Sequence, residues 1–433
     1  MSVSPRAPRS AFRAAGALAV AVVLGAAMGV GGTALASKSA SVVPPTATVT
    51  ASPRSQRAGV PSPTPPPPVT FTLVAAGDVL PHAPVVSSAT TAAGIDFLPL
   101  MAPVLPYIEG ADLALCHMEV PVTPPGTSAS GYPMFAAPPE LVPSLAAAGW
   151  DGCSTASNHS VDRRGAGIAA TLEAFGVAGM GAAGTARTEE EAASAQIYTV
   201  RGADRDVTVA HISFAYDGLN GLPKPPNQPW AVNTFSADQA DAAPIIAAAQ
   251  QARDQGADIV VASVHCCVEY QTEPTAAQRS VAEQVAASGL VDLWIGHHSH
   301  VPQPIEKLEG GPNGDGMWVA FGLGNFLSNQ DTQCCVANTN SGVLLTATFT
   351  IDASDGVDVR VEWTAITVDR LSKHTMQVLT DIPDGAGRLS AAEVAARHQR
   401  VAEAVGPQAP ERTSPASHVA FGVDMIPRTT VTQ

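Results

Sequence analysis

Short apolar runs alternate with longer amphipathic segments along the chain from Phe71 onward. The strand-like runs lie at residues 71–76, 111–119, 152–159, 257–265 and 291–298. The segments with apolar residues at helical spacing lie at residues 139–149, 165–179, 236–256 and 275–289. Each of these segments ends in a glycine, which is a usual helix stop. Strands that alternate with helices of this length predict a layered α/β fold.

The later apolar runs predict antiparallel strands, so the sheet is expected to be mixed. Residues 342–351 and 357–368 look like an antiparallel pair. The folded domain is therefore placed at residues 70–370. After it the chain is polar and rich in Pro and Gly, with one candidate helix at 390–405. Residues 371–433 are expected to form a polar C-terminal extension.

The N-terminal segment has the pattern of an export signal. A basic start without acidic residues is followed by an apolar stretch and a small-residue site that ends at Ala36. Residues 1–36 are therefore expected to be either a cleaved signal peptide or an N-terminal membrane anchor. Residues 37–69 are rich in Pro, Ser and Thr and are expected to form a disordered linker. Either alternative predicts an extracytoplasmic protein, secreted or anchored to the cell membrane.

Composition excludes some classes of function. The chain has 433 residues and a net charge of −15. An acidic protein has no bulk attraction to nucleic acid, which is therefore not expected as a partner. The sequence contains no G-x-S-x-G, which argues against a serine hydrolase with a nucleophile elbow.

Cysteine usage is consistent with an oxidising compartment. The chain has six cysteines, namely Cys116, Cys153, Cys266, Cys267, Cys334 and Cys335. Disulfides are the default expectation outside the cell, although spacing alone does not determine their connectivity. The absence of C-x-x-C leaves a zinc ribbon without support.

Groups suited to metal binding follow five of the strand-like runs directly. They are Asp78, Glu119, Asn158 with His159, His265, and the stretch His297–His300. In layered α/β proteins ligands bind beyond the carboxyl ends of the strands, so these side chains are expected to converge. Taken singly, each fits an ordinary turn or a structural histidine. Because the pattern recurs at all five of these strand ends, we predict a site for one or two divalent ions such as Mn, Fe or Zn.

The three histidines at the end of the run 291–298 and just beyond it are central to this prediction. His298 and His300 occupy alternate positions, so a bend at the end of the strand is expected to aim both inward. A carboxylate that bridges two ions would hold them ~3.5–4 Å apart, an arrangement that enzymes use on phosphate esters. His82, His117 and His211 are expected to be structural or solvent-facing.

Six motifs in order resemble those of the CapA (PgsA-like) capsule-synthesis family, which is similar to the calcineurin-like metallophosphoesterases. They are AAGDVLPH, ADLALCHMEVPVT, STASNHSVDRRGAGI, VVASVHCCVEYQTEPTAAQ, VDLWIGHHSHVPQPIE and VAFGLGNFLSNQ. The resemblance implies a four-layer α/β/β/α metallophosphoesterase-like sandwich with mixed sheets. It also implies an extracytoplasmic role in poly-γ-glutamate capsule synthesis or export.

The resemblance also implies a role for each matched residue. It implies metal ligands at Asp78, Glu119, Asn158, His265, His298 and His300, with Glu119 in the bridging position. It further implies that His159 acts as a general acid for the leaving group and that Asp162 orients it.

Two departures from the family pattern bear on the site. Metallophosphoesterases usually carry Asp-x-His on the first strand, but the position that matches this histidine is Leu80 here. Whether His82, two residues further on, replaces that histidine is left open by the sequence. An aromatic residue and Gly usually follow the histidine at position 265, where this chain has two cysteines. We expect these thiols to form disulfides with Cys334 or Cys335, the alternative being a thiolate near a metal.

Two functions remain open. The first is a metal-dependent hydrolase that acts on a phosphate ester or on a γ-glutamyl amide of a surface polymer. The second is a non-catalytic accessory or scaffold protein of a membrane complex that synthesises and exports the polymer. Either function would use the same predicted edge of the sheet.

Overall fold

The computed structural model describes residues 67–202, 205–420 and 422–428. The predicted signal or anchor at 1–36 lies outside the described residues, as does nearly all of the predicted linker at 37–69. Among the residues that the structure describes, no helix is both long and apolar enough to cross a membrane.

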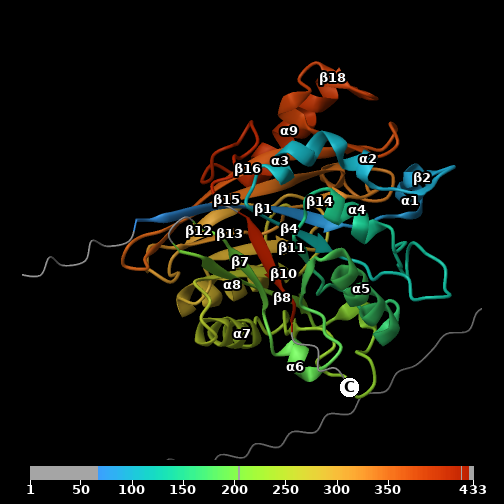
Figure 1. The fold of residues 1–433 in the computed structure, drawn as a ribbon. Coiled ribbons are helices and arrows are strands. Elements are labelled where there is room, and N and C mark those ends of the chain that lie inside the picture. Colours follow the sequence, from blue (N-terminus) through green and yellow to red (C-terminus); the bar gives the residue numbers. More distant parts are fainter. Residues whose placement is uncertain (1–66, 203–204, 421, 429–433) are drawn as a thin grey trace, which may run out of the picture. The chain divides into compact units, whose positions relative to one another are not determined.

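The first sheet is mixed (Figure 1). Its order is β17 (Thr375–Val378), β16 (Val357–Asp369), β15 (Ser341–Ile351), β1 (Val69–Val79), β4 (Leu113–Met118), β5 (Gly152–Ser154) and β6 (Gly181–Ala183), with β14 (Asn325–Leu327) beside the end of β1. Strand β1 runs parallel to β4 and β14 but antiparallel to β15. The predicted antiparallel pair is β15 and β16.

The second sheet is also mixed. Its order is β12 (Ile305–Leu308), β13 (Met317–Ala320), β11 (Leu293–His297), β10 (Ile259–His265), β8 (Val207–Tyr216), β7 (Gln196–Val200) and β20 (Val423–Ile426), with β9 (Thr234–Phe235) beside β8. The central strands β8, β10, β11 and β13 are parallel to one another.

Helices and short elements connect these strands. The helices are α1 (Ala83–Ala89), α2 (Leu98–Met101), α3 (Leu105–Glu109), α4 (Leu141–Ala147), α5 (Arg164–Ala178), α6 (Glu189–Ala192), α7 (Ala243–Asp254), α8 (Ala276–Ser288) and α9 (Ala391–Val405). Short strand pairs are formed by β2 (Thr90–Thr91) with β3 (Gly94–Ile95) and by β18 (Gly385–Ala386) with β19 (Leu389–Ser390).

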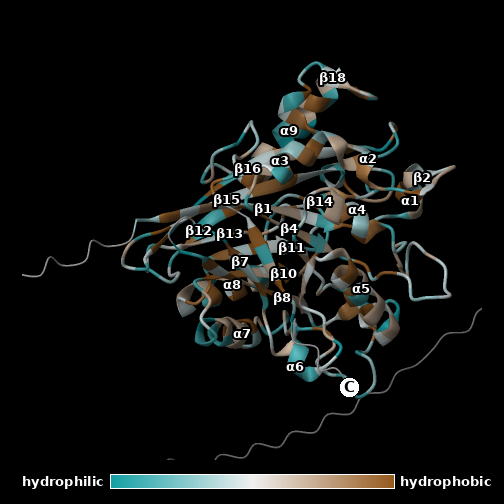
Figure 2. Ribbon diagram, viewed as in Figure 1, coloured by the Kyte–Doolittle hydropathy of each residue, from teal (hydrophilic) through white to brown (hydrophobic). Residues whose placement is uncertain are grey.

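Three apolar cores hold the layers together. The core between the two sheets includes Phe71 and Leu73 from β1 and Ile259 and Val261 from β10. A second core packs the other face of the first sheet against α1 to α5, and a third packs the second sheet against α7 and α8. Figure 2 shows the strands of both sheets largely in brown. The predicted four-layer α/β/β/α sandwich with mixed sheets is confirmed.

Residues beyond 370 contribute to these layers. Strand β17 lies at one edge of the first sheet and β20 at one edge of the second. Helix α9, whose N-cap Ser390 accepts a hydrogen bond from the Glu393 amide, adds Val394 and Val401 to the core between the sheets. The segment expected as an extension thus supplies an edge strand to each sheet.

The disulfides differ from the expected pairing. Cys116 on β4 is joined to Cys153 on β5, at positions that pair in the sheet. The two adjacent pairs are each joined internally, Cys266 to Cys267 and Cys334 to Cys335. The predicted cross-link between the two pairs is therefore wrong. No cysteine is left free, so the alternative of a thiolate near a metal has no support.

Candidate metal centre

The candidate site lies where the carboxyl ends of the central strands of both sheets meet. In the first sheet, β1 and β4 are parallel neighbours. Asp78 lies near the end of β1, and Glu119 follows β4 directly. In the second sheet, the parallel neighbours β10 and β11 end at His265 and His297. All four side chains are buried. The two sheets face each other, so four separate strand ends contribute to one site.

Two glycines allow the segment around β14 to approach β1 closely. A side chain at Gly77 would collide with the carbonyl oxygen of Gly324, which accepts a hydrogen bond from the Asp78 amide at 2.9 Å. Gly324 has a φ of 69°, a conformation that favours glycine. This close approach places Asn325 in register with Asp78.

His300 lies between the carboxylates of Asp78 and Glu119. Its Nδ1 is 3.0 Å from Oδ2 of Asp78, and its Nε2 is 3.6 Å from Oε1 of Glu119. Nδ1 hydrogen bonds to Oδ1 of Asn325 at 3.1 Å. Oδ2 of Asp78 is buried without a hydrogen-bond partner, although Nδ1 of His300 is near. Donor atoms of Asp78, Glu119 and His300, one from each residue, lie within 4.8 Å of one another, close enough to share an ion.

The other three predicted ligands form the adjoining half of the site. Oδ1 of Asn158 lies 2.9 Å from Nε2 of His265, and the ring centroid of His298 is 4.6 Å from that of His265. The amide nitrogen of His298 lies 3.5 Å from Oδ1 of Asp78, which connects the two halves. The structure thus brings all six predicted ligands together, although their role as ligands stays a prediction.

The backbone turns sharply where the second sheet meets the site. Strand β11 ends at His297, and the next residues include His298 at a φ of 84° and His300 at a φ of 56°. Positive φ costs a residue with a Cβ on the order of 1 kcal/mol or more, and such strain is concentrated at functional sites. The bend turns the ring of His300 toward Asp78 and the ring of His298 toward His265.

Several buried atoms of the cluster lack a hydrogen-bond partner. They are Oδ2 of Asp78, both carboxylate oxygens of Glu119 and Nδ1 of His298. A buried carboxylate without partners is costly, and cations are what two such carboxylates attract. Oxygen and imidazole donors in this proportion suit Mn, Fe or Zn. The residues present therefore fit a divalent ion.

The protonation of the cluster also favours a cation between the carboxylates. Burial would raise the pKa of Asp78, but contacts with His297 and His300 bring it well below its usual range. Burial raises the pKa of Glu119 well above its usual range. Burial would lower the pKa of His300, but Glu119 and Asp78 raise it to about 10. Burial lowers the pKa of His298 to about 3, so this ring is neutral and keeps a lone pair.

A family model described as "Bacterial capsule synthesis protein PGA_cap" matches residues 72–330. The chain belongs to this family. This PGA_cap chain is 30% identical to the "PGA biosynthesis protein CapA" of Bacillus subtilis (strain 168) over 178 residues, which are 41% of this chain and 42% of that protein. It is 26% identical to the "Probable polyglutamine synthesis accessory protein MT0602" of Mycobacterium tuberculosis (strain CDC 1551 / Oshkosh) over 222 residues, 51% of this chain and 56% of that protein. The chain thus spans about half the length of the curated relatives it matches.

Two solved structures to which this PGA_cap chain is similar are described as a phosphatase and a phosphoesterase. A phosphatase from Mycoplasma pneumoniae aligns with a TM-score of 0.36 and 12% identity, over 68% of this chain and 94% of that chain. The calcineurin-like phosphoesterase YfkN of Bacillus subtilis aligns with a TM-score of 0.38 and 12% identity, over 77% of this chain and 97% of that chain.

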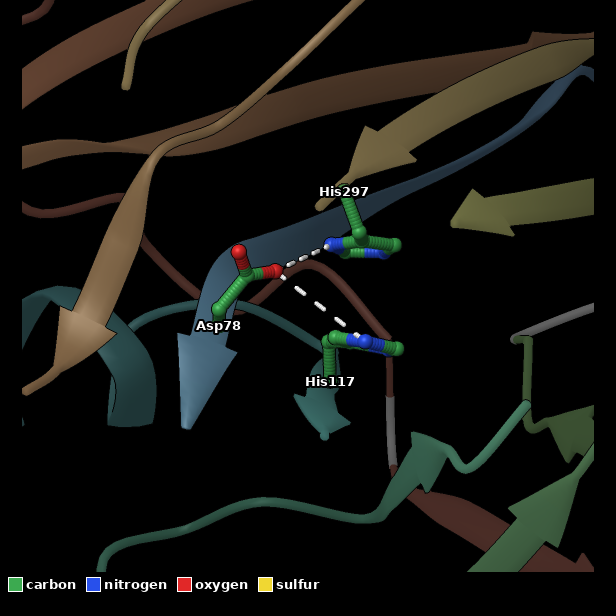
Figure 3. A group of neighbouring side chains, drawn as sticks. All are labelled: Asp78, His117 and His297. Atoms are coloured by element: carbon green, nitrogen blue, oxygen red, sulfur yellow. Dashed lines mark ion pairs between the residues drawn. The ribbon is translucent and has the colours of Figure 1, made fainter. Parts of the chain in front are cut away.

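Two further histidines of this PGA_cap chain lie inside the site, namely His117 and His297, which belongs to the predicted stretch but was not assigned as a ligand (Figure 3). His117 was predicted to be structural or solvent-facing, but it is buried with its Nε2 4.0 Å from Oδ1 of Asp78. Nδ1 of His297 lies 3.5 Å from the same oxygen. The two rings are stacked, with centroids 4.0 Å apart and planes 13° apart. Since an imidazole lone pair lies in the ring plane, one ion cannot be coplanar with both rings.

His117 contacts the predicted ligand His265 directly. Its Nδ1 hydrogen bonds to Oγ of Ser154 at 2.7 Å, and its Nε2 lies 2.9 Å from Nδ1 of His265. These contacts fix the ring of His265 so that its Nε2 faces Asn158. Groups that hold the second nitrogen of a metal-binding histidine orient the ligand and tune its basicity.

The position that departs from the phosphoesterase pattern adds no ligand. Leu80 is buried in the apolar core between the first sheet and the helices. His82 does not join the ligand cluster, since its Nδ1 contacts the Leu80 carbonyl oxygen at 2.9 Å and its ring packs edge-on against Phe135.

Sequence reasoning also missed an acid from another loop, Glu269, whose Oε1 is 3.9 Å from Nε2 of His300.

The predicted acid pair lies next to the ligands. Nδ1 of His159 is 2.7 Å from Oδ2 of Asp162, which also accepts a hydrogen bond from the Phe135 amide at 2.7 Å. Asn220 accepts a hydrogen bond from Nδ2 of Asn158 at 3.0 Å, which leaves Oδ1 of Asn158 facing His265. Asp162 is thus placed to orient His159, and the catalytic role of the pair stays a prediction.

Proposed function

We propose that this PGA_cap protein is a metal-dependent hydrolase that acts on a phosphate ester or a γ-glutamyl amide during surface-polymer synthesis or export. The proposal depends on one observation, the buried cluster of carboxylate, amide and imidazole groups with several unpartnered atoms. The names of two relatives refer to PGA biosynthesis and to polyglutamine synthesis, which supports a polymer as the biological context.

The residues of the cluster would hold one or two divalent ions. The proposed ligands are Asp78, Glu119, Asn158, His265, His298 and His300. A bound ion at such a site lowers the pKa of a water and stabilises negative charge on an attacked phosphoryl or carbonyl group. Because the side chains are buried and supported by His117 and Asn325, they need little rearrangement to hold an ion.

His159 is the proposed general acid. Its Nδ1–H is held by Asp162, so Nε2 is the ring nitrogen left to pass a proton to the leaving group. Its ring packs edge-on against Phe135, with centroids 4.8 Å apart, which limits rotation. The adjacent residue Asn158 joins this pair to the proposed ligands.

The proposed location is extracytoplasmic, either secreted or anchored. The basic start, the apolar stretch and the small-residue site at the N-terminus support it. The proposed partner is a membrane complex that synthesises or exports the polymer.

The second candidate function is that of a non-catalytic accessory protein in the same complex. The word "accessory" in the name of the Mycobacterium tuberculosis relative favours it. The apolar residue Leu80, where phosphoesterases usually carry a ligand, also favours it.

Turnover measurements distinguish the two candidates. Purified protein is assayed on phosphomonoesters, phosphodiesters and γ-glutamyl peptides with added Mn²⁺, Fe²⁺ or Zn²⁺. For a hydrolase, His159→Ala should lower the rate by about 10²- to 10⁴-fold. His418→Ala, a change at a largely exposed histidine, should leave the rate unchanged. Protein that binds ions but turns over none of these substrates would favour the accessory role. An unchanged rate for His159→Ala would contradict the mechanism.

A further inference from the structure

We infer that Glu269 is a further metal ligand, which supplies the donor that Leu80 does not. This inference deepens the proposed function, because it presumes that the cluster holds an ion. The sequence pattern did not point to Glu269, since it follows no strand directly. It lies in the loop between β10 and α8.

The distances around His300 fit an ion shared with Glu269. Nε2 of His300 is 3.9 Å from Oε1 of Glu269 and 3.6 Å from Oε1 of Glu119. Ligand bonds of about 2.0–2.2 Å place two donors on one ion roughly 3 to 4.3 Å apart, depending on the angle. Donor atoms of Glu269, His298 and His300 also all lie within 4.8 Å of one another.

The hydrogen bonds of Asn325 decide which nitrogen of His300 faces the ion. Nδ2 of Asn325 donates to Oε1 of Gln330 at 2.9 Å and to the Thr339 carbonyl at 2.8 Å. Its Oδ1 is therefore the atom turned to Nδ1 of His300, at 3.1 Å. An acceptor at that position places a proton on Nδ1. In the neutral ring the lone pair is then on Nε2, which faces Glu119 and Glu269.

The loop that carries Glu269 is fastened to the histidine loop on both sides of this residue. The Cys266 amide donates to the His297 carbonyl at 3.3 Å, and the Tyr270 amide donates to the Ser299 carbonyl at 2.8 Å. Tyr270 has a φ of 67°, so the chain turns immediately after Glu269. These contacts hold the Glu269 carboxylate next to His300.

An exposed acid near a histidine is common without a metal, but other atoms here also point to an ion. Both carboxylate oxygens of Glu119 and Oδ2 of Asp78 are buried without a hydrogen-bond partner. These two carboxylates lie next to the imidazole ring of His300. Glu269 itself is 38% exposed in its side chain, unlike these two residues. Glu269 would therefore bind the ion from the solvent-facing side of the site, where water or substrate could also reach the ion.

Metal binding by two matched variants tests this inference. Glu269→Gln removes the charge with little change of shape. Glu273→Gln makes the same change on the same loop, at an exposed residue outside the candidate ligand groups of the described residues. Both full-length proteins and the wild type are titrated with Mn²⁺ and with Zn²⁺ by calorimetry, and bound metal is counted by mass spectrometry. Circular dichroism checks that each variant is folded.

We expect Glu269→Gln either to lose one ion per chain or to bind Mn²⁺ at least about 10-fold more weakly. Glu273→Gln should match the wild type. Equal stoichiometry and affinity in Glu269→Gln and the wild type would overturn the inference while leaving the proposed metal centre intact. A wild type that binds no ion would instead refute the metal centre itself, and this inference with it. An equal loss in both variants would show a general charge effect and would also overturn the inference.

Discussion

Replacing His117 by Phe should weaken metal binding without touching a proposed ligand. Phe keeps a ring to stack on His297 but removes the hydrogen bonds to Ser154 at 2.7 Å and to His265 at 2.9 Å. The buried Nδ1 of His265 is then unpaired, which costs about 1–3 kcal/mol.

This cost should appear in the affinity for metal. Without ion, the freed ring of His265 can rotate toward another partner, and binding must return it to the orientation that faces Asn158. We therefore expect the Kd for Mn²⁺ to rise about 10- to 100-fold, which corresponds to about 1.4–2.7 kcal/mol. His117→Gln places an amide near the former Nε2 and should recover part of the affinity.

The control is a second buried histidine that also hydrogen bonds to a serine. His211 on β8 contacts Oγ of Ser263 at 2.8 Å and belongs to none of the candidate ligand groups among the described residues. His211→Phe should lower stability and leave the Kd for Mn²⁺ unchanged. Calorimetric titration of the folded proteins measures the Kd, and urea unfolding measures stability. Wild-type affinity in His117→Phe, or an equal loss in His211→Phe, would refute the proposed support of His265.

Four further predictions concern stability and covalent structure. Burial lowers the pKa of His211 to about 3 from about 6.5 in the unfolded chain. Its contribution to stability is thus full above about pH 6.5 and is lost as the pH falls toward about 3. As the pH falls through that range, the free energy of unfolding of His211→Gln should therefore decrease by about 4 kcal/mol less than that of the wild type, as measured by urea unfolding. Parallel pH profiles of the two free energies would contradict this. The double variant Cys116→Ala, Cys153→Ala, which opens a bridge with a sequence separation of 37, should lower the free energy of unfolding by about 3–4 kcal/mol, and an unchanged urea midpoint would refute this. Non-reducing peptide mapping should find Cys266 linked to Cys267 and not to another cysteine. A chelator should lower the Tm of protein saturated with Mn²⁺, since an ion at 100 times its Kd adds about 2.7 kcal/mol, and an unchanged Tm would argue against a bound ion.

The layered fold and the convergence of strand ends could be predicted because both follow from regular patterns. The apolar runs and the helical segments that end in glycine predicted the order of the elements. Helix α8 begins where its pattern starts, because the Thr275 side chain caps it by accepting a hydrogen bond from the Gln278 amide. Parallel strands place their carboxyl ends at one edge, which is why Asp78 and His265 could be expected to meet although they are far apart in sequence.

Helix ends and cysteine pairing depend on local backbone geometry that spacing does not show. The predicted helix at 236–256 begins only at Ala243, because Ala240 has a φ of 48° and Asp241 accepts a hydrogen bond from the Ala243 amide at 3.0 Å. Cys266 bonds to Cys267 and Cys334 bonds to Cys335, so these four cysteines do not link distant loops.

The missed histidine had a signal, but it requires knowledge that two sheets face each other. Along β4, Leu113 and Leu115 point into the core between the sheets, and His117 continues the same alternation. His297 continues the inward-facing series of β11 in the same way. A polar residue at the end of an inward series faces the opposite sheet, as His117 does where it contacts His265 of β10. Glu269 had no such signal, because its position depends on the fastening of a loop.

The same convergence would make a bound ion part of the stability of this fold. Two buried carboxylates with unpartnered oxygens cost several kcal/mol each unless a positive charge compensates them. Without an ion, the imidazolium of His300 compensates the charge of Asp78, and the raised pKa of Glu119 favours a proton on that carboxyl. A divalent ion would compensate both carboxylates and allow the ring of His300 to become neutral. Because neutral imidazole is the form that binds metal, metal binding at this cluster should release a proton. Buffer-dependent heats in calorimetric titrations with Mn²⁺ would reveal that proton, and heats independent of the buffer would contradict this account of the charges.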